Sequence, residues 1–323
     1  MLKRFLCGLV LSIFGVMPAA ANDSVAQLGA GGIILVFADD IEMEKEDLYI
    51  STQEVRVKYQ FRNRADRDRT YLVAFPMPEI VAPGYLESDI AVPDRDRENF
   101  MNFSATVAGK PVETKLDMRA LTGGVDITDR ITALGIPLNP LSQSTQDAVN
   151  WTPREKLQEL IDMGALRVYE KDIWPQWSLR ASYYWLQTFP ANGTLDVAHS
   201  YAPAAGSSFF YSALLDEKAY TAKYCIDDGT AKAIKRKLGE QKAEFPYLLT
   251  RDIQYVLSSG ANWFGPIKDF RLVVDKGSPD AILSLCMDGV TKISPTQFEV
   301  RRTDFEPTKD IDLIVVGGAP AEQ

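Results

Sequence analysis

His199 is the only histidine in the 323-residue chain, so any reaction that needs an imidazole base depends on it. A Ser–His–acid triad also needs an activated serine, but the chain has no G-x-S-x-G turn and no serine followed by lysine three residues later. Val197, His199 and Tyr201 alternate along an apparent strand and therefore share one face. This pattern favours a packed, hydrogen-bonded structural histidine, and a weak ligand-binding role is the alternative.

Aromatic side chains are the second candidate for function, because flat rings on a sheet can stack on sugars or hold an extended peptide. Five of them fall between positions 174 and 185: Trp174, Trp177, Tyr183, Tyr184 and Trp185. Tyr183 and Trp185 share one face of the expected strand, and Tyr184 takes the other. Burial between two sheets is the usual role of such rings. A weak binding surface formed by Trp174, Trp177, Tyr183 and Trp185 is the functional hypothesis.

Acidic side chains offer two further kinds of chemistry. A glycosidase needs only two carboxylates at the right separation, but the sequence does not select the pair. Acids are densest between positions 39 and 47, which suggests calcium, an ion that takes six to eight oxygen ligands. These acids are Asp39, Asp40, Glu42, Glu44, Glu46 and Asp47. They lack the spacing of an EF-hand loop, and alternation predicts an outward strand face, so we expect no metal. We also expect no cofactor, since "LGAGG" precedes a strand rather than a helix.

The N-terminus has the pattern of a secretory signal peptide. Lys3 and Arg4 precede an apolar run that ends near Met17, and three alanines follow before Asn22. We expect cleavage after Ala21, and residues 1–21 are called the leader below. Thirteen apolar residues are too few to cross ~30 Å of hydrocarbon at about 1.5 Å per residue. The mature protein is therefore predicted to be periplasmic or secreted and not to span the membrane.

Cysteine count and charge limit the classes of function. Cys7 leaves with the leader, and the remaining pair, Cys225 and Cys286, predicts one disulfide in an exported protein, with two buried thiols as the alternative. Two cysteines and one histidine make a zinc site improbable. The chain has 44 acidic and 35 basic residues, a net charge of −9. Nucleic acid is excluded as a partner, since binding phosphates needs a basic surface.

Apolar residues alternate with polar ones through residues 54–62, which predicts a strand with one buried face. A polar turn and a second strand, 70–75, follow, so the two are expected to form a hairpin. The strand 41–50 is expected to lie alongside and to set acids against the basic face at Arg56 and Lys58. Strands 177–189 and 195–203 are expected to turn through Asn192 and Gly193.

The order of these elements predicts a mainly β fold of two β-sandwich-like parts. Residues 22–120 are expected to form an N-terminal β domain. Residues 121–172 are expected to be a helical connector, with helices near 126–135 and 152–164 and a polar link between them. Residues 173–323 are expected to form a C-terminal β-rich domain with a further helix after Asp227 and Asp228.

Several blocks of the chain resemble an exported bacterial family known as domain of unknown function 4424. The blocks are "NDSVAQLGAGG", "EDLYIS", "VRVKYQFRN" to "VAFPMP", "FPANG" with "HSYAP", "YCID", "WFGPI" and "SPTQFEV". The resemblance implies an exported domain pair and carries no catalytic residues with it.

The leading functional hypothesis is a cell-envelope protein that binds or interacts without catalysis, with an envelope protein or glycan as partner. The first alternative is a glycan hydrolase that uses two carboxylates in an aromatic-lined cleft. The second is a structural spacer, which predicts neither a pocket nor an exposed aromatic cluster.

Overall fold

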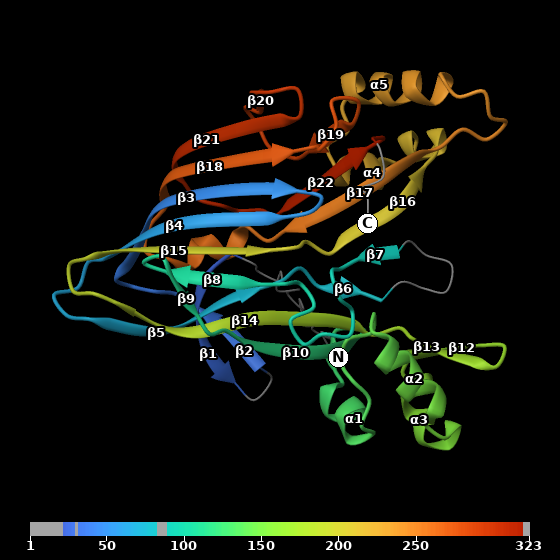
Figure 1. The fold of residues 1–323 in the computed structure, drawn as a ribbon, viewed down its shortest axis with the longest axis horizontal. Helices are drawn as coiled ribbons and strands as arrows, with labels where there is room; N and C mark the ends of the chain where they lie inside the picture. The colour runs from blue at the N-terminus through green and yellow to red at the C-terminus, as the bar shows by residue number, and fades with distance from the viewer. Residues whose placement is uncertain (1–21, 30–31, 83–88, 319–323) are drawn as a thin grey trace, which may run out of the picture.

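The computed structural model describes residues 22–29, 32–82 and 89–318, and the predicted leader lies outside the described residues. Strands in four sheets dominate this part of the chain, and its helices are short (Figure 1). The mainly β fold class is therefore confirmed.

The largest sheet has eight strands drawn from both halves of the chain. In spatial order they are β20 (Thr291–Lys292), β21 (Gln297–Phe305), β18 (Ile267–Asp275), β3 (Ile41–Ser51), β4 (Val55–Asn63), β15 (Thr194–Tyr201), β8 (Ser104–Val107) and β9 (Lys110–Val112). Neighbours are antiparallel except β18 and β3, which are parallel. As alternation predicts, β4 turns every second residue inward: Val55, Val57, Tyr59 and Phe61 are all buried.

A seven-stranded sheet lies below the eight-stranded one in Figure 1. Its strands are β11 (Val125–Asp126), β10 (Lys115–Thr122), β14 (Ser178–Phe189), β5 (Arg69–Pro76), β1 (Ser24–Gly29) and β2 (Gly32–Val36), with β6 (Ile80–Val81) paired to one end of β14. Buried apolar residues from both sheets form one continuous core, which includes Phe61, Phe75 and Tyr183. This shared core makes the two sheets the layers of a sandwich.

A third sheet extends beyond the sandwich, at the upper right of Figure 1. Its strands are β19 (Ile282–Leu285), β22 (Ile311–Val316), β17 (Leu248–Tyr255), β16 (Ala205–Phe210) and β7 (Asp89–Ala91). The nearby short helices are η1 (Ser212–Leu215), α4 (Lys218–Lys223), α5 (Asp228–Gly239) and η2 (Ser258–Asn262). Ile234 and Leu238 of α5 pack on one face of this sheet. Asp227 caps α5 as predicted, since its carboxylate accepts a hydrogen bond from the Thr230 backbone at 2.7 Å.

The helical part has its own small core. It comprises α1 (Thr128–Ala133), α2 (Gln143–Trp151), α3 (Arg154–Asp162) and a two-stranded sheet of β12 (Leu166–Tyr169) and β13 (Asp172–Pro175). Helix α2 occupies the stretch expected to be a polar link. Its N-cap is Ser142, whose hydroxyl accepts a hydrogen bond from the Thr145 backbone N–H at 3.1 Å. Only Thr145 and Val149 of this helix are buried, so its sequence shows little apolar pattern.

Two expected hairpins are wrong in the same way. Strand β4 pairs with β3 and β15, whereas β5 pairs with β14 and β1 in the other sheet. The turn at residues 64–68 therefore carries the chain from one layer to the other. The turn at Asn192 and Gly193 does the same between β14 and β15. The expected pairing of the strand 41–50 with 54–62 is correct, and Asp47 lies opposite Lys58.

The sheets also cross the boundaries expected between sequential domains. β18 pairs with β3, β15 with β4, and β14 with both β5 and β10. Residues 22–120 and 173–323 thus share three sheets and one core, so their strands do not separate into two sequential domains. The helical part is more local, since its core takes residues only from Ala120 to Trp177, which is close to the expected range 121–172.

Candidate functional site

The aromatic residues singled out from the sequence are mostly interior. Tyr183 and Trp185 of β14 face the sandwich core, where the Tyr183 ring stacks on Phe103 at 4.3 Å between centroids. Trp177 lies in the core of the helical part, and its indole N–H donates to the Leu138 carbonyl at 2.8 Å. Trp174 of β13 is half-buried. This burial supports the alternative of ordinary core packing and contradicts a binding surface built from Trp177, Tyr183 and Trp185.

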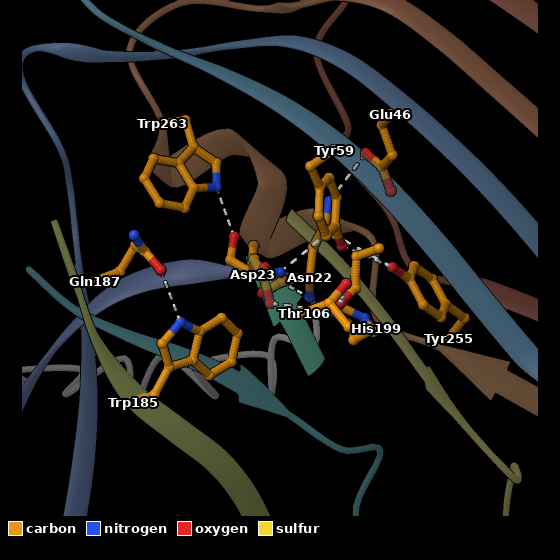
Figure 2. A network of polar contacts seen from close by, with 12 residues as sticks. Asn22, Asp23, Glu46, Tyr59, Thr106, Trp185, Gln187, His199, Tyr255 and Trp263 are labelled. Carbon is orange, nitrogen blue, oxygen red and sulfur yellow. Dashed lines mark hydrogen bonds and ion pairs between the residues drawn. The ribbon is translucent and has the colours of Figure 1, made fainter. Parts of the chain in front are cut away.

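His199 instead belongs to a buried polar cluster, shown in Figure 2. We define this cluster as Asn22, Asp23, Glu46, Tyr59, His199 and Tyr255, all of which are buried. They come from the residues before β1 and from strands β3, β4, β15 and β17. The cluster therefore lies where the two layers and the third sheet meet.

Glu46 reaches this cluster because of a β-bulge. The pairing of β3 with β4 shifts between Met43 and Lys45, which leaves Glu44 as an extra residue. Ile41 and Met43 face inward before the bulge, and Glu46 faces inward after it. The acids of 39–47 were expected to lie mostly on an outward strand face, and Glu46 is the exception within β3, since strict alternation does not pass through a bulge.

The other acids of this stretch are mostly paired with arginine. Glu42 lies 3.5 Å from Arg64, and Glu44 lies 3.6 Å from Arg62. Asp47 lies 3.1 Å from Arg271. In the described part of the chain, no three His, Cys, Asp or Glu side chains converge as metal ligands. This stretch is thus a set of cross-strand ion pairs in the structure.

Hydrogen bonds tie the cluster around Asn22. Its side-chain amide donates to Glu46 at 3.1 Å, and its carbonyl oxygen accepts from the Tyr59 hydroxyl. Tyr59 and Tyr255 place their hydroxyls 3.3 Å apart. Burial is the main cause that raises the pKa of Glu46 to about 8, and it raises the pKa of Asp23 well above its usual range, with Glu46 as a second cause.

His199 was expected to be packed and hydrogen-bonded. It is packed, but neither ring nitrogen has a hydrogen-bond partner among the described residues. The centroid of its ring lies 4.2 Å from the Phe75 ring centroid and 5.6 Å from the Tyr59 ring centroid. Burial lowers the pKa of His199 to about 3. Asp23 lies 3.6 Å from Nδ1, but burial keeps both groups neutral, so this contact is not an ion pair. The buried polar cluster is closed to solvent and offers no substrate access.

A wide surface groove lies beside the disulfide. Cys225 and Cys286 are bonded, as predicted, and line a groove of about 1010 Å³. Three acids of this groove make structural contacts. Asp227 caps α5, Asp310 accepts from the backbone and hydroxyl of Ser258, and Asp312 lies 3.9 Å from Lys223. Three of the four acids that line the groove therefore already have partners, and Asp288 is the fourth.

A smaller cleft of about 240 Å³ lies at the end of the third sheet, and we call it the sheet-end cleft. Its lining residues come from the β3–β4 turn, β17, the loop after β18 and the end of β22: Thr52, Gln53, Leu249, Thr250, Arg251, Lys276, Gly277, Ser278, Val315, Gly317 and Gly318. Among these described residues there is no acid. Two are cationic, and Gly277 and Gly317 have positive φ angles that favour glycine.

Lys276 is the most constrained cation of the sheet-end cleft. It is only 8% exposed, and its ammonium donates to the carbonyls of Pro279 and Ala281. An ammonium has three N–H donors, so one is left for a ligand. Burial, followed by repulsion from Lys292, lowers the pKa of Lys276. An anion in the cleft would offset both effects.

Exposed aromatic rings border this cleft. The aromatic patch, defined as Phe209, Tyr211 and Tyr247, has centroid separations of 4.9 to 6.4 Å. Phe209 is 51% exposed and lies opposite Leu249, which lines the cleft, so the two side chains share one face of the sheet. No pattern predicted this patch, because its rings come from β16 and from the loop before β17.

The fold and these sites define the class: a mainly β protein with a closed polar cluster inside a sandwich and an open cationic cleft beside exposed rings. The chain belongs to the family described as Domain of unknown function (DUF4424), whose profile matches residues 21–314. The resemblance drawn from the sequence blocks is confirmed to this extent.

Comparison with curated proteins finds no match. Among solved structures, the chain is similar to a proposed nutrient-binding protein from Legionella pneumophila, with 15% identity and a TM-score of 0.45. The similarity covers 92% of this chain and 70% of that one. None of the helices in the described ranges has the length and apolar character needed to cross a bilayer.

Proposed function

We propose that the protein is an exported, non-catalytic binding protein whose ligand occupies the sheet-end cleft and the aromatic patch. The observation that carries this proposal is the position of Lys276, a buried cation that lines an acid-free cleft next to exposed rings. Burying a cation costs free energy unless it is paired, so such a group suits a ligand that brings a negative charge.

The ligand class that fits best is an acidic glycan. Flat aromatic faces suit the apolar face of a sugar ring, and Lys276 with Arg251 suits a carboxylate on that sugar. An envelope protein is the other candidate partner. A glycan is favoured because the cleft is small, about 240 Å³, and takes one or two sugar units rather than a protein surface.

The two alternatives have less support. The hydrolase needs two carboxylates in an aromatic-lined cleft, and the described lining of the sheet-end cleft contains none. The acids that lie together in the interior, Asp23 and Glu46, are buried away from any substrate. The spacer predicts neither a pocket nor exposed rings, and the described surface has both.

Export is part of this proposal. The leader supports a periplasmic or secreted location, and so does the Cys225–Cys286 disulfide, which is stable in an oxidising compartment. The net charge of −9 disfavours nucleic acid as a partner.

Calorimetric titration with uronic-acid oligosaccharides and their neutral counterparts tests the proposal. We expect binding of the acidic set only, and a loss of affinity of about 10-fold or more in Tyr247→Ala and in Arg251→Ala. Trp151→Ala is the matched control, because Trp151 is also an exposed ring, at 82%, but lies on α2. Equal binding of neutral sugars, or self-association abolished by Tyr247→Ala, would contradict the proposal.

A further inference from the structure

The residues that follow the predicted leader are among the most buried in the described chain. Asn22, Asp23 and Ser24 are each 0% exposed. The backbone nitrogen of Asn22 donates to the Ser259 hydroxyl, and that hydroxyl donates to the Asn22 carbonyl at 2.7 Å. Trp263 donates to the Asp23 carbonyl at 2.6 Å. Chain termini are usually exposed and poorly ordered, so this close fit requires an explanation.

The surroundings of Asn22 are short of positive charge. Both carboxylate oxygens of Asp23 and one of Glu46 have no hydrogen-bond donor among the described residues. His199 is neutral, since burial lowers its pKa to about 3. No lysine or arginine belongs to the cluster. A buried carboxyl group without hydrogen-bond partners is destabilising, and an ionised one without a counter-ion is more so, which makes the cluster as described incomplete.

We propose that cleavage of the Ala21–Asn22 bond completes the cluster, and that the α-ammonium of Asn22 is the buried counter-ion of Glu46. This inference rests on the proposed export of the protein. Hydrolysis by the endopeptidase of the export route consumes one water, leaves the carboxyl group on Ala21 and frees the amino group of Asn22. That amine, whose ordinary pKa is near 7.7 to 8.0, takes up a proton where attraction to the Glu46 carboxylate outweighs the desolvation that lowers the pKa of a buried amine.

The geometry of Asn22 suits this role. Its side-chain amide contacts Glu46 at 3.1 Å, and the backbone nitrogen of the same buried residue contacts the Ser259 hydroxyl. An ammonium supplies three donors where the peptide N–H supplies one. One would remain with Ser259, and the proposal requires that another reach the unpaired oxygen of Glu46. The fit is tight, since a Cβ on Gly260 would come within 2.6 Å of the Asn22 amide.

A metal ion is the rival occupant of this pocket. It is disfavoured because the described residues contain no group of three His, Cys, Asp or Glu side chains placed to hold one. The consequence is that the leader does more than direct export. Its removal would supply the one charge that the interior needs, so the protein reaches full stability only after processing.

The test compares two proteins that differ by one residue. Both are made as fusions to a carrier whose protease leaves no extra residue, so that one begins at Asn22 and the other at Ala21. We expect the form that begins at Asn22 to melt about 5 to 10 °C higher, as for a restored buried ion pair. Its α-amine should also react with an N-terminal acylating reagent at least about 10-fold more slowly, since reaction requires local opening.

Substitution of the partner gives the second arm. Glu46→Gln should abolish the difference in melting temperature between the two forms, whereas Glu44→Gln, on the same strand and paired with Arg62, should preserve it. Equal melting temperatures together with equal acylation rates in the unsubstituted pair would overturn the proposal, even if Glu46→Gln fails to fold. So would a first residue other than Asn22 in the protein exported by its own leader, measured by intact mass. None of these readouts involves a glycan, so they stand apart from the binding proposal.

Discussion

His199 illustrates how burial, rather than residue type, decides what a side chain does. The only imidazole in the chain lies among aromatic rings, has no hydrogen-bond partner in the described structure and stays neutral. A base of this kind cannot serve a surface reaction. It does make the protein sensitive to acid, because the unfolded chain takes up the proton that the folded chain refuses.

Replacing His199 with glutamine should remove this acid sensitivity. The folded pKa of about 3 lies below the ordinary histidine pKa of 6.5, so stability is lost as pH falls from 6.5 towards 3. Between pH 7 and 4.5 the wild type should lose about 2 to 3 kcal/mol of unfolding free energy relative to His199→Gln, measured by urea unfolding. Asp23 and Glu46 have raised pKa values and opposite slopes, but both proteins contain them. Parallel pH profiles for the two proteins would disprove the assignment.

At the scale of elements, strand β3 shows how one extra residue redirects a whole strand. The bulge at Glu44 keeps Ile41 and Met43 inside while bringing Glu46, Leu48 and Ile50 inside as well. Without the extra residue, the same five side chains would alternate regularly. The bulge therefore sets which residues of β3 face inward after Met43, and it reconciles this sequence with a period of two.

Deletion of Glu44 should accordingly be tolerated. The shortened strand alternates without interruption, and the lost ion pair with Arg62 is partly exposed, so the cost should be about 1 kcal/mol or less. Deletion of Asp47 is the control, since it turns Leu48 and Ile50 to the outside and should prevent folding. Circular dichroism and urea melts measure both. A folded protein without Asp47, or an unfolded one without Glu44, would refute this account of β3.

At the scale of the molecule, strands from distant parts of the chain share sheets. The parallel pair of β3 and β18 joins residues more than two hundred positions apart. The sandwich core likewise takes Val25 and Val315 into one cluster. Neither half of the chain can bury its apolar surface alone, so the sandwich is a single cooperative unit.

A fragment comprising residues 173–323 should therefore fail to fold on its own. Its strands β14, β15 and β18 would each lose a neighbour supplied by residues 41–122. We expect poor amide dispersion in a proton–nitrogen NMR spectrum and no cooperative melt. Co-expression with residues 22–172 should restore the amide dispersion and the cooperative melt, which would show that the fragment is able to fold when its partner strands are present. A well-dispersed spectrum of the isolated fragment would instead show that residues 173–323 form an independent domain.

Local features of this protein follow from its sequence. The buried face of β4 follows from the two-residue period of side chains along a strand. The start of α5 follows from the Asp227 cap. Both features depend only on residues that are neighbours in the sequence, and so does the mainly β character. The pairing of Cys225 with Cys286 was the preferred prediction from the sequence, and the structure selects it over two separate buried thiols.

Tertiary structure decided the rest. Residues 54–75 look like a hairpin, yet their two strands join different sheets, because a polar turn permits either path and distant partners choose between them. Trp185 and Phe209 are both aromatic strand residues, but one lies in the core and the other on the surface. Which face of a sheet is covered depends on elements far away in the chain, and no local pattern contains that information. The cleft at Lys276 and the pocket at Asn22 arise in the same way.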